Sequence, residues 1–181
     1  MRYSKLFGKT SKEVPREATA VSHQLLLRGG FIQQVTAGIY QFLPLGFRVL
    51  QKIDRIIREE FAKMEVQDLL MPSVHPASLW EESGRIDKMG GILARFENEI
   101  GQAFVLAPTH EETVTDLARH VIRSYKDMPV IVNQNQFKFR NELRVQGGLL
   151  RTREFIMQDA YSFDADQEGL DKSYGIMRQA Y

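Results

Sequence analysis

The sequence predicts an α+β fold in which helices flank a mainly antiparallel sheet. One long segment, residues 45–64, repeats apolar residues at intervals of three and four, as an amphipathic helix does. Two strand-like segments, 129–142 and 149–163, lie on either side of a loop that contains two adjacent glycines. Such a loop joins antiparallel neighbours, and the order helix, strand, helix and long hairpin is typical of the α+β class.

The composition is that of a single globular unit. The sequence has 181 residues, 43% hydrophobic and 26% charged, with no internal repeat and no Pro-, Gly- and Ser-rich linker. The net charge is only +1, so contact with a polyanion depends on local clusters of Arg and Lys. The lack of cysteine excludes disulfides and thiolate metal sites. We see no signal peptide or membrane span, and we expect a cytoplasmic protein without a membrane or DNA partner.

The first predicted elements are short. Residues 17–30 predict a helix that ends at Gly29-Gly30, because glycine accepts the left-handed conformation found at helix ends. Its buried face is expected to comprise Val21, Leu25 and Leu26. Residues 31–47 mix apolar and polar positions with Gly and Pro, which predicts short extended pieces and a turn.

Residues 45–64 carry the clearest helical pattern. Its apolar stripe consists of Val49, Ile53, Ile56, Ile57, Phe61 and Met64. Residues 66–72 then predict a strand that stops at Pro72, since proline cannot donate a hydrogen bond to a neighbouring strand. A turn-rich stretch containing residues 79–85 follows.

A strand that runs into a helix is predicted over residues 101–125. Thr109 with Glu112 three residues later matches a capping box, the pairing that satisfies backbone donors at a helix start. The expected buried stripe of this helix comprises Val114, Leu117, Ala118, Val121 and Tyr125. Trp80, from the preceding stretch, is expected in the core or an interface, and His110 as a surface or packing residue.

The final hairpin combines arginines with aromatic residues. The two-residue period of a strand places Arg140 and Glu142 on one face, and Arg151 on the same face as Phe155. A guanidinium group can bind a phosphate through two parallel hydrogen bonds, and an aromatic ring can stack on a base. These residues therefore predict a nucleotide site, in which Glu142 accepts from an exocyclic amine or holds an arginine in place. The alternative is a solvated hairpin with surface ion pairs.

The hairpin also resembles motif 2 of the class II aminoacyl-tRNA synthetases. "FRNE" (139–142), a loop, "RTREF" (151–155) and Asp159 follow that motif, which we place at about 137–163. The helix and strand at about 38–72 are similar to motif 1. "LWEESGR", "PTHEE" and "REFIMQDAYSF" closely resemble the bacterial prolyl-tRNA synthetases. The similarity extends over nearly the whole chain, which we interpret as the N-terminal part of the catalytic domain, residues 1–181.

The resemblance implies a fold, a reaction and partners. The fold is an antiparallel sheet walled by helices, in a homodimer joined largely through motif 1. L-Proline and ATP, the latter with Mg²⁺, would form prolyl-adenylate, and the prolyl group would then pass to tRNA(Pro). No zinc is expected. A zinc-dependent threonyl-tRNA synthetase relative is the alternative enzyme, and a noncatalytic binding or dimerisation module is the alternative of another class.

The resemblance also assigns roles to particular residues. Arg140 would bind the α-phosphate and stabilise the transition state as the proline carboxylate attacks, which makes it both a catalytic and a proline-contacting residue. Glu142 would meet the adenine amino group, Phe155 would stack on the adenine ring, and Arg151 would lie near the outer phosphates.

The proline amine would be bound by Thr109 and Glu111, since a carboxylate suits a cation with two N–H donors. From the residues alone, the same segment can instead be a helix start, where acidic residues are favoured. The histidines have no metal-ligand spacing, and no metal site is predicted.

The sequence departs from the family at two places. The motif 2 loop, in which the family usually has "RPRFG", here has "RVQGG", so that Arg144 is kept but a basic and an aromatic residue are replaced. No glycine-rich motif 3 with its arginine, no editing domain and no anticodon-binding domain is present in these residues. We therefore expect this chain by itself to have little or no aminoacylation activity.

Overall fold

The computed structural model describes residues 2–181, which divide into two compact units. Unit 1 comprises the chain up to Ile56 together with Glu142–Phe155. Unit 2 comprises Ile57–Asn141 and Ile156–Tyr181. The mixed helices and sheets confirm the α+β prediction. No helix in the described part of the chain is both long enough and apolar enough to span a membrane.

Unit 1 is built on a helix and a hairpin. Its elements are η1 (Tyr3–Lys5), α1 (Val21–Arg28), β1 (Ile32–Thr36), β2 (Ile39–Phe42), the first part of α2 (Pro44–Ala62) and η4 (Gly148–Leu150). The strands β1 and β2 pair in antiparallel fashion, and Gly30 takes a positive φ of 68° just beyond α1. The predicted helix, its glycine end and the short extended pieces are confirmed.

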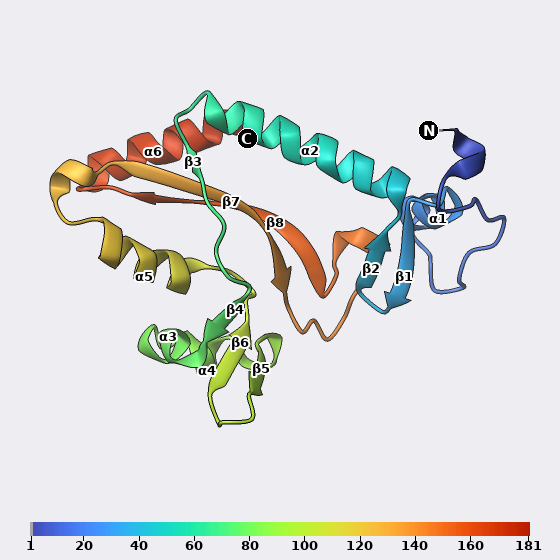
Figure 1. Ribbon diagram of the computed structural model, residues 1–181, viewed down its shortest axis with the longest axis horizontal. Helices are drawn as coiled ribbons and strands as arrows, with labels where there is room; N and C mark the ends of the chain where they lie inside the picture. Colours follow the sequence, from blue (N-terminus) through green and yellow to red (C-terminus); the bar gives the residue numbers. More distant parts are fainter. Residues whose placement is uncertain (1) are drawn as a thin grey trace. The chain divides into compact units, whose positions relative to one another are not determined.

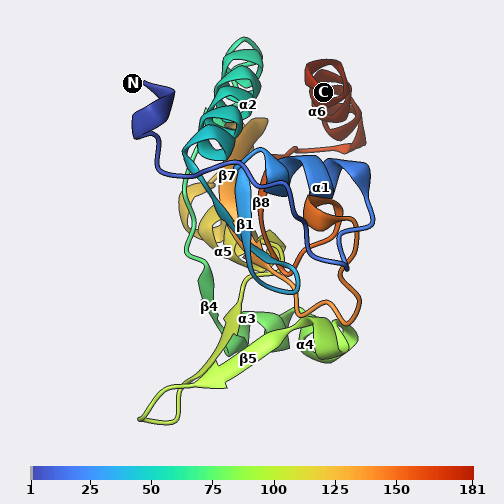
Figure 2. The same ribbon diagram turned by 90° about the vertical axis from the view of Figure 1, so that its right-hand side faces the viewer.

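The predicted buried face of α1 is wrong. Val21 and Leu25 are exposed, and the buried residue of the helix is His23. The His23 ring packs edge-on against Tyr40, and Gly148 lies so close that an added Cβ would be 2.7 Å from the ring. Figure 2 shows α1 beside the η4 turn. The partner of α1 thus lies more than a hundred residues further along the chain, where helical periodicity carries no information.

Unit 2 contains two three-stranded sheets, with strand orders β3-β7-β8 and β4-β6-β5. The elements after α2 are β3 (Gln67–Asp68), β4 (Val74–Pro76), α3 (Ala77–Glu82), α4 (Arg85–Lys88), η2 (Gly90–Ile92), β5 (Ala94–Glu97), β6 (Ala103–Leu106), α5 (Glu111–Val121), η3 (Tyr125–Asp127), β7 (Val130–Phe139), β8 (Glu154–Phe163) and α6 (Gln167–Ala180). The pairs of β6 are antiparallel, whereas β3 lies parallel to β7. In Figure 1, the β4-β6-β5 sheet lies beside α3 and α4.

The long helix α2 confirms the clearest prediction, but only one end of its apolar stripe is buried. Phe61 packs with Val66 and Ile131 in a core cluster of unit 2. Val49, Ile53 and Ile56 remain 45%, 50% and 55% exposed. An exposed apolar row of this kind on a helix marks a surface suited to a partner.

Two predictions between α2 and β6 need correction. The strand expected over 66–72 shortens to Gln67–Asp68, followed by one further bond from Leu69 N to Asn133 O at 2.8 Å, and Leu70 is largely exposed. The stretch expected to be turn-rich forms two short helices, α3 and α4, separated by a turn at Gly84, whose φ is 64°. Elements this short hold too few residues for periodicity to reveal them. Trp80 is fully buried in the core of this region, as predicted.

The predicted capping box of α5 is also wrong. The helix begins after His110, and the His110 side chain makes no capping hydrogen bond. Within the predicted stripe, Val114 is buried while Leu117, Val121 and Tyr125 are exposed. The reason is that α5 packs through Val114 and the buried Glu112. The Glu112 carboxylate accepts from Ser83, just after α3, and pairs with Arg85 on α4, so a polar residue replaces part of the apolar face.

Candidate functional site

The predicted proline-binding segment is placed next to Arg140 by the end of β7. Phe139 N donates to Ala107 O at 2.9 Å, which holds the end of β7 beside the segment that follows β6. Arg140 Nε then donates to Pro108 O at 3.1 Å. Thr109, Glu111 and Arg140 are therefore brought together within unit 2.

A buried ion pair lies beneath this segment. Lys138 on β7 is 1% exposed, and its Nζ lies 3.0 Å and 3.2 Å from the two carboxylate oxygens of Asp159 on β8. Asp159 Oδ2 also accepts from Tyr161 Oη at 2.5 Å and from Gln134 Nε2 at 3.1 Å. Burying two charges is costly unless both are paired and hydrogen-bonded, and here they are. The network therefore fixes the directions of these side chains.

Two buried histidines complete the network, and one carbonyl determines their tautomers. Pro72 O can only accept, and it lies 3.0 Å from Nε2 of both His75 and His110. Each Nε2 must therefore carry the proton, which leaves each Nδ1 as an acceptor. Trp80 Nε1 donates to His75 Nδ1 at 3.2 Å, and Lys138 Nζ donates to His110 Nδ1.

The charge states of the two histidines follow from this arrangement. Burial is the largest cause that lowers the pKa of His75 and of His110, and the positive charge of Lys138 lowers both further, to about 4 in each case. Both rings are consequently neutral near pH 7. Of the two positions predicted for His110, the surface is wrong and a packed position is confirmed, because its side chain is fully buried.

Glu111 is held in its ionised form at the start of α5. Burial by itself raises the pKa of a carboxyl, but hydrogen bonds from Thr109, the backbone and Arg85 outweigh burial and lower the pKa of Glu111. Tyr161 shows the opposite behaviour, since burial and the bond to Asp159 raise the pKa of its hydroxyl, which keeps its proton. An ionised carboxylate beside the Thr109 hydroxyl offers two acceptors of the kind that a small organic cation needs.

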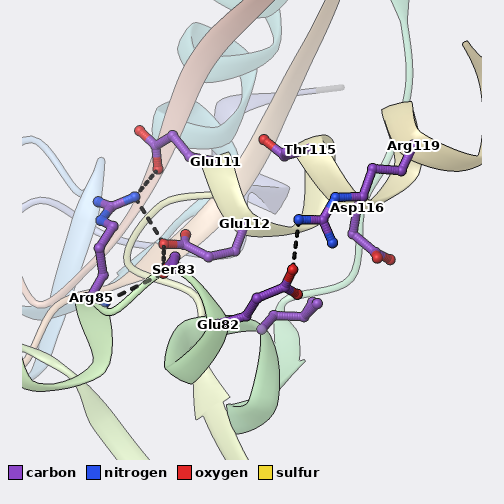
Figure 3. Close-up of a pocket in the computed structure, with 9 residues that line it drawn as sticks. Glu82, Ser83, Arg85, Glu111, Glu112, Thr115, Asp116 and Arg119 are labelled. Atoms are coloured by element: carbon purple, nitrogen blue, oxygen red, sulfur yellow. Dashed lines mark hydrogen bonds and ion pairs between the residues drawn. The ribbon is translucent and has the colours of Figure 1, made fainter.

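Glu111 also lines a cleft of about 230 Å³, which lies between α5 and the turn that joins α3 to α4. Figure 3 shows nine residues that line this cleft, with Glu111 and Arg85 at one end and the pair of Glu82 and Arg119 at the other. Arg85 Nη1 lies 3.1 Å from Glu111 Oε2 and 3.0 Å from Glu112 Oε1.

The remaining predicted residues belong to unit 1. Glu142 Oε2 accepts from Arg151 Nε at 3.1 Å and from Arg151 Nη2 at 2.7 Å, a two-pronged pair that fixes both side chains. Arg153 fastens the same loop by donating to Ala37 O at 3.0 Å and to Glu142 O at 3.1 Å. Phe155, at the start of β8, is half-buried.

Comparison with known proteins shows which proteins the chain resembles. Residues 95–181 match the family model of the tRNA synthetase class II core domain (G, H, P, S and T). Over all 181 residues the chain is 55% identical to proline-tRNA ligase of Halothermothrix orenii and 54% identical to that of Dehalococcoides mccartyi. Over its whole length the chain is similar to proline-tRNA ligases. The matches include all of this chain but only 32% of each relative. The chain therefore spans about a third of the length of these relatives.

Solved structures of prolyl-tRNA synthetases have the same fold. The Giardia lamblia enzyme in complex with prolyl-adenylate superposes with a TM-score of 0.76 and 25% identity, over 83% of this chain and 32% of that one. The Cryptosporidium parvum enzyme complexed with halofuginone and AMPPNP gives 0.80 and 20% identity, over 96% and 37%. At 20% identity, the similarity to the Cryptosporidium parvum enzyme concerns the fold.

Two interpretations of the hairpin are resolved by the geometry. The hypothesis that Glu142 holds an arginine in place is confirmed by its pair with Arg151. The alternative prediction of a solvated hairpin is wrong for β7, because the charged Lys138 is buried while the apolar Phe137 is 49% exposed. The strand thus buries part of its polar face, because the charges find partners on α5 and β8.

The patterns in the sequence did not predict the network around Lys138. Lys138 and Gln134 stand at the same parity in a strand that is otherwise rich in Val, Ile and Phe, and this was the available signal. Their burial could not be deduced, because it depends on Asp159 and Tyr161 from β8 and on His110 from α5.

Proposed function

We propose that the chain is part of the catalytic domain of a proline-tRNA ligase that activates L-proline with ATP and charges tRNA(Pro) in the cytoplasm. The observation that carries the proposal is the union of Thr109, ionised Glu111 and anchored Arg140 within one unit. The 55% identity to a proline-tRNA ligase supports it. We assign motif 1 to about 38–72 and motif 2 to about 137–163.

Thr109 and Glu111 bind the amine of proline in this proposal. The secondary ammonium group of proline offers two N–H donors and one positive charge, which a carboxylate and a hydroxyl can accept together. Glu111 is ionised before the substrate arrives, so no proton has to leave on binding. The Giardia lamblia prolyl-tRNA synthetase was solved in complex with prolyl-adenylate, which agrees with this substrate.

Arg140 acts on the phosphate. A proline carboxylate oxygen attacks the α-phosphorus of ATP, the bond from that phosphorus to the bridging oxygen breaks, and pyrophosphate leaves with the electron pair. The guanidinium group of Arg140, fixed through Nε on Pro108 O, stabilises the charge that builds on the α-phosphoryl oxygens. Positioning and electrostatics supply the catalysis, and no protein base is required.

Three residues of unit 1 bind the rest of ATP. Glu142 accepts from the adenine amino group, Phe155 stacks on the adenine ring, and Arg151 lies near the outer phosphates. The pair of Arg151 and Glu142 orders both side chains in advance. Residues 2–181 contain no group of three His, Asp or Glu side chains that could hold a metal ion. We expect Mg²⁺ to arrive with ATP and assign no step and no zinc to the chain.

The decisive experiment tests turnover in a complete enzyme. Residues 1–181 would be fused in frame to the remaining two thirds of the Halothermothrix orenii ligase, in place of its homologous segment. We expect proline-dependent exchange of pyrophosphate into ATP. Arg140→Ala should lower kcat by about 10²–10³-fold, while Phe155→Ala should mainly raise KM for ATP, by about tenfold.

Arg123→Ala, which removes an exposed arginine outside the site, is the matched control and should leave both constants unchanged. An inactive fusion beside an active parent ligase would favour the second candidate, a noncatalytic binding or dimerisation module. Unchanged kinetics in both Arg140→Ala and Phe155→Ala would show that the hairpin is not the nucleotide site.

A further inference from the structure

We propose that Arg85 is a positioning residue of the proline site, which holds the Glu111 carboxylate in place for the ammonium group of proline. The proposal rests on the proposed role of Glu111 and adds a residue that contacts neither ATP nor the reacting atoms. Arg85 lies on α4, in a region where the sequence predicted only turns, and it reaches across the cleft to the first turn of α5 (Figure 3).

The need for such a residue follows from the exposure of Glu111. Its side chain is 51% exposed, and an exposed glutamate at the start of a helix can adopt several rotamers. Ordering a carboxylate before its ligand arrives avoids an entropic cost on binding. Arg85 Nη1, 3.1 Å from Glu111 Oε2, supplies that order.

Arg85 can do this because its own guanidinium group is fixed from the protein interior. The same Nη1 lies 3.0 Å from Glu112 Oε1, and the Glu112 side chain is only 2% exposed. Ser83 Oγ also donates to Glu112 Oε1, at 3.0 Å. On its other side, the guanidinium carbon of Arg85 lies 5.4 Å from the centre of the fully buried Trp80 ring.

The charges of the cleft are consistent with this role. Glu111 and Glu112 are adjacent carboxylates that share one cation, Arg85, so one negative charge is left for the substrate. Other groups that act on Glu111 include the Thr109 hydroxyl, the protonated Tyr161 and Lys138, whose charge is paired with Asp159. A ligand with a single positive charge balances the site, which fits a prolinium ion.

The cleft also offers a matched control. Arg119 pairs with Glu82 at 2.6 Å at the other end of the same cleft, and these side chains are 56% and 55% exposed. This pair has the same chemistry as Arg85 with Glu111 but lacks the buried anchor. Arg119→Gln therefore removes the same charge from the same cleft without releasing Glu111.

The test uses the full 181-residue chain and two probes in isothermal titration calorimetry. Prolyl-sulfamoyl-adenosine carries the prolyl ammonium group, whereas AMPPNP carries only the nucleotide. Arg85→Gln should weaken binding of the prolyl probe about tenfold and leave AMPPNP unchanged. Arg85→Lys should recover part of the loss, and Arg119→Gln should bind both probes as the wild type does. Equal loss for both probes, or no loss for Arg85→Gln, would overturn the proposal.

A second measurement does not depend on ligand binding. NMR titration of the Glu111 carboxyl carbon should show that this group titrates at higher pH in Arg85→Gln than in the wild type, with no change in Arg119→Gln. An unchanged titration in Arg85→Gln would show that Arg85 does not hold Glu111. If the wild type binds AMPPNP but not the prolyl probe, the proposed proline site itself fails, whatever the titration shows.

Discussion

At the scale of single residues, the site depends on a buried network that no local sequence pattern predicts. Lys138 is paired with Asp159, and the two neutral histidines share the Pro72 carbonyl. Each polar group is held by a partner from another element, so the network orients Tyr161 and the Thr109 segment as one assembly. Rigid support of this kind is what a binding site for a small cation needs.

The histidines make stability depend on pH. Their pKa is about 4 in the folded chain and about 6.5 when unfolded, so between these values the unfolded chain binds more protons. The stabilisation is complete above pH 6.5 and is lost as pH falls towards 4. Each histidine should cost about 2 kcal/mol of unfolding free energy between pH 7.5 and pH 5. Urea denaturation of the wild type and His110→Gln should show a shallower decline in the variant, and equal slopes would contradict this.

At the scale of elements, α2 begins against the backbone of unit 1. Leu43 N donates to Phe31 O at 2.9 Å just before the helix, and Gly46 sits so close that an added Cβ would be 2.1 Å from the same oxygen. A backbone atom cannot move aside as a side-chain end can. The glycine is therefore required by the close approach of two segments, although nothing in the helical pattern marks it.

Two glycine substitutions in helices should therefore have opposite effects. Gly46→Ala should lower the free energy of unfolding by about 1–3 kcal/mol, because the methyl group meets the Phe31 carbonyl. Gly175→Ala, in α6, meets no atom within 4 Å and should raise it by about 0.5–1 kcal/mol. Thermal and urea denaturation measure both. A change of the same sign in the two variants would refute the packing argument.

At the scale of the whole molecule, the exposed apolar row on α2 bears on assembly. Val49, Ile53 and Ile56 are about half exposed in the single chain, in the segment that we assign to motif 1. Burial of such side chains against a second copy contributes about 25 cal/mol for each Å² removed from water. The row supports the proposed homodimer.

A charge in this row should therefore separate the subunits. Ile53→Asp is expected to convert a dimer of the wild-type chain into a monomer, because a carboxylate would be buried without a partner in the interface. Sedimentation velocity over a range of concentrations measures the change. Val121→Asp places the same charge at an exposed apolar position on α5 and should leave the dimer intact. A monomeric wild type would remove the basis of the prediction.

Sequence patterns predicted the elements whose cause is local. The α1 end at Gly29-Gly30, the length of α2 and the strands β7 and β8 depend on residues a few positions apart, and all are confirmed. The capping box at Thr109 failed, although its pattern was correct. Thr109 instead hydrogen-bonds with Glu111 and Tyr161, and the latter lies on β8.

The sequence by itself determined the α+β class, because helical and strand patterns depend on residue type at short spacing, and its resemblance to the class II synthetases named the candidate proline and ATP residues. Only the tertiary structure decided that Lys138, Asp159 and His110 form one buried network, and that Arg85 meets Glu111 across a cleft. Burial and pairing are properties of segments far apart in the chain. Their energies are set by which groups lose water together, and that depends on how the elements pack.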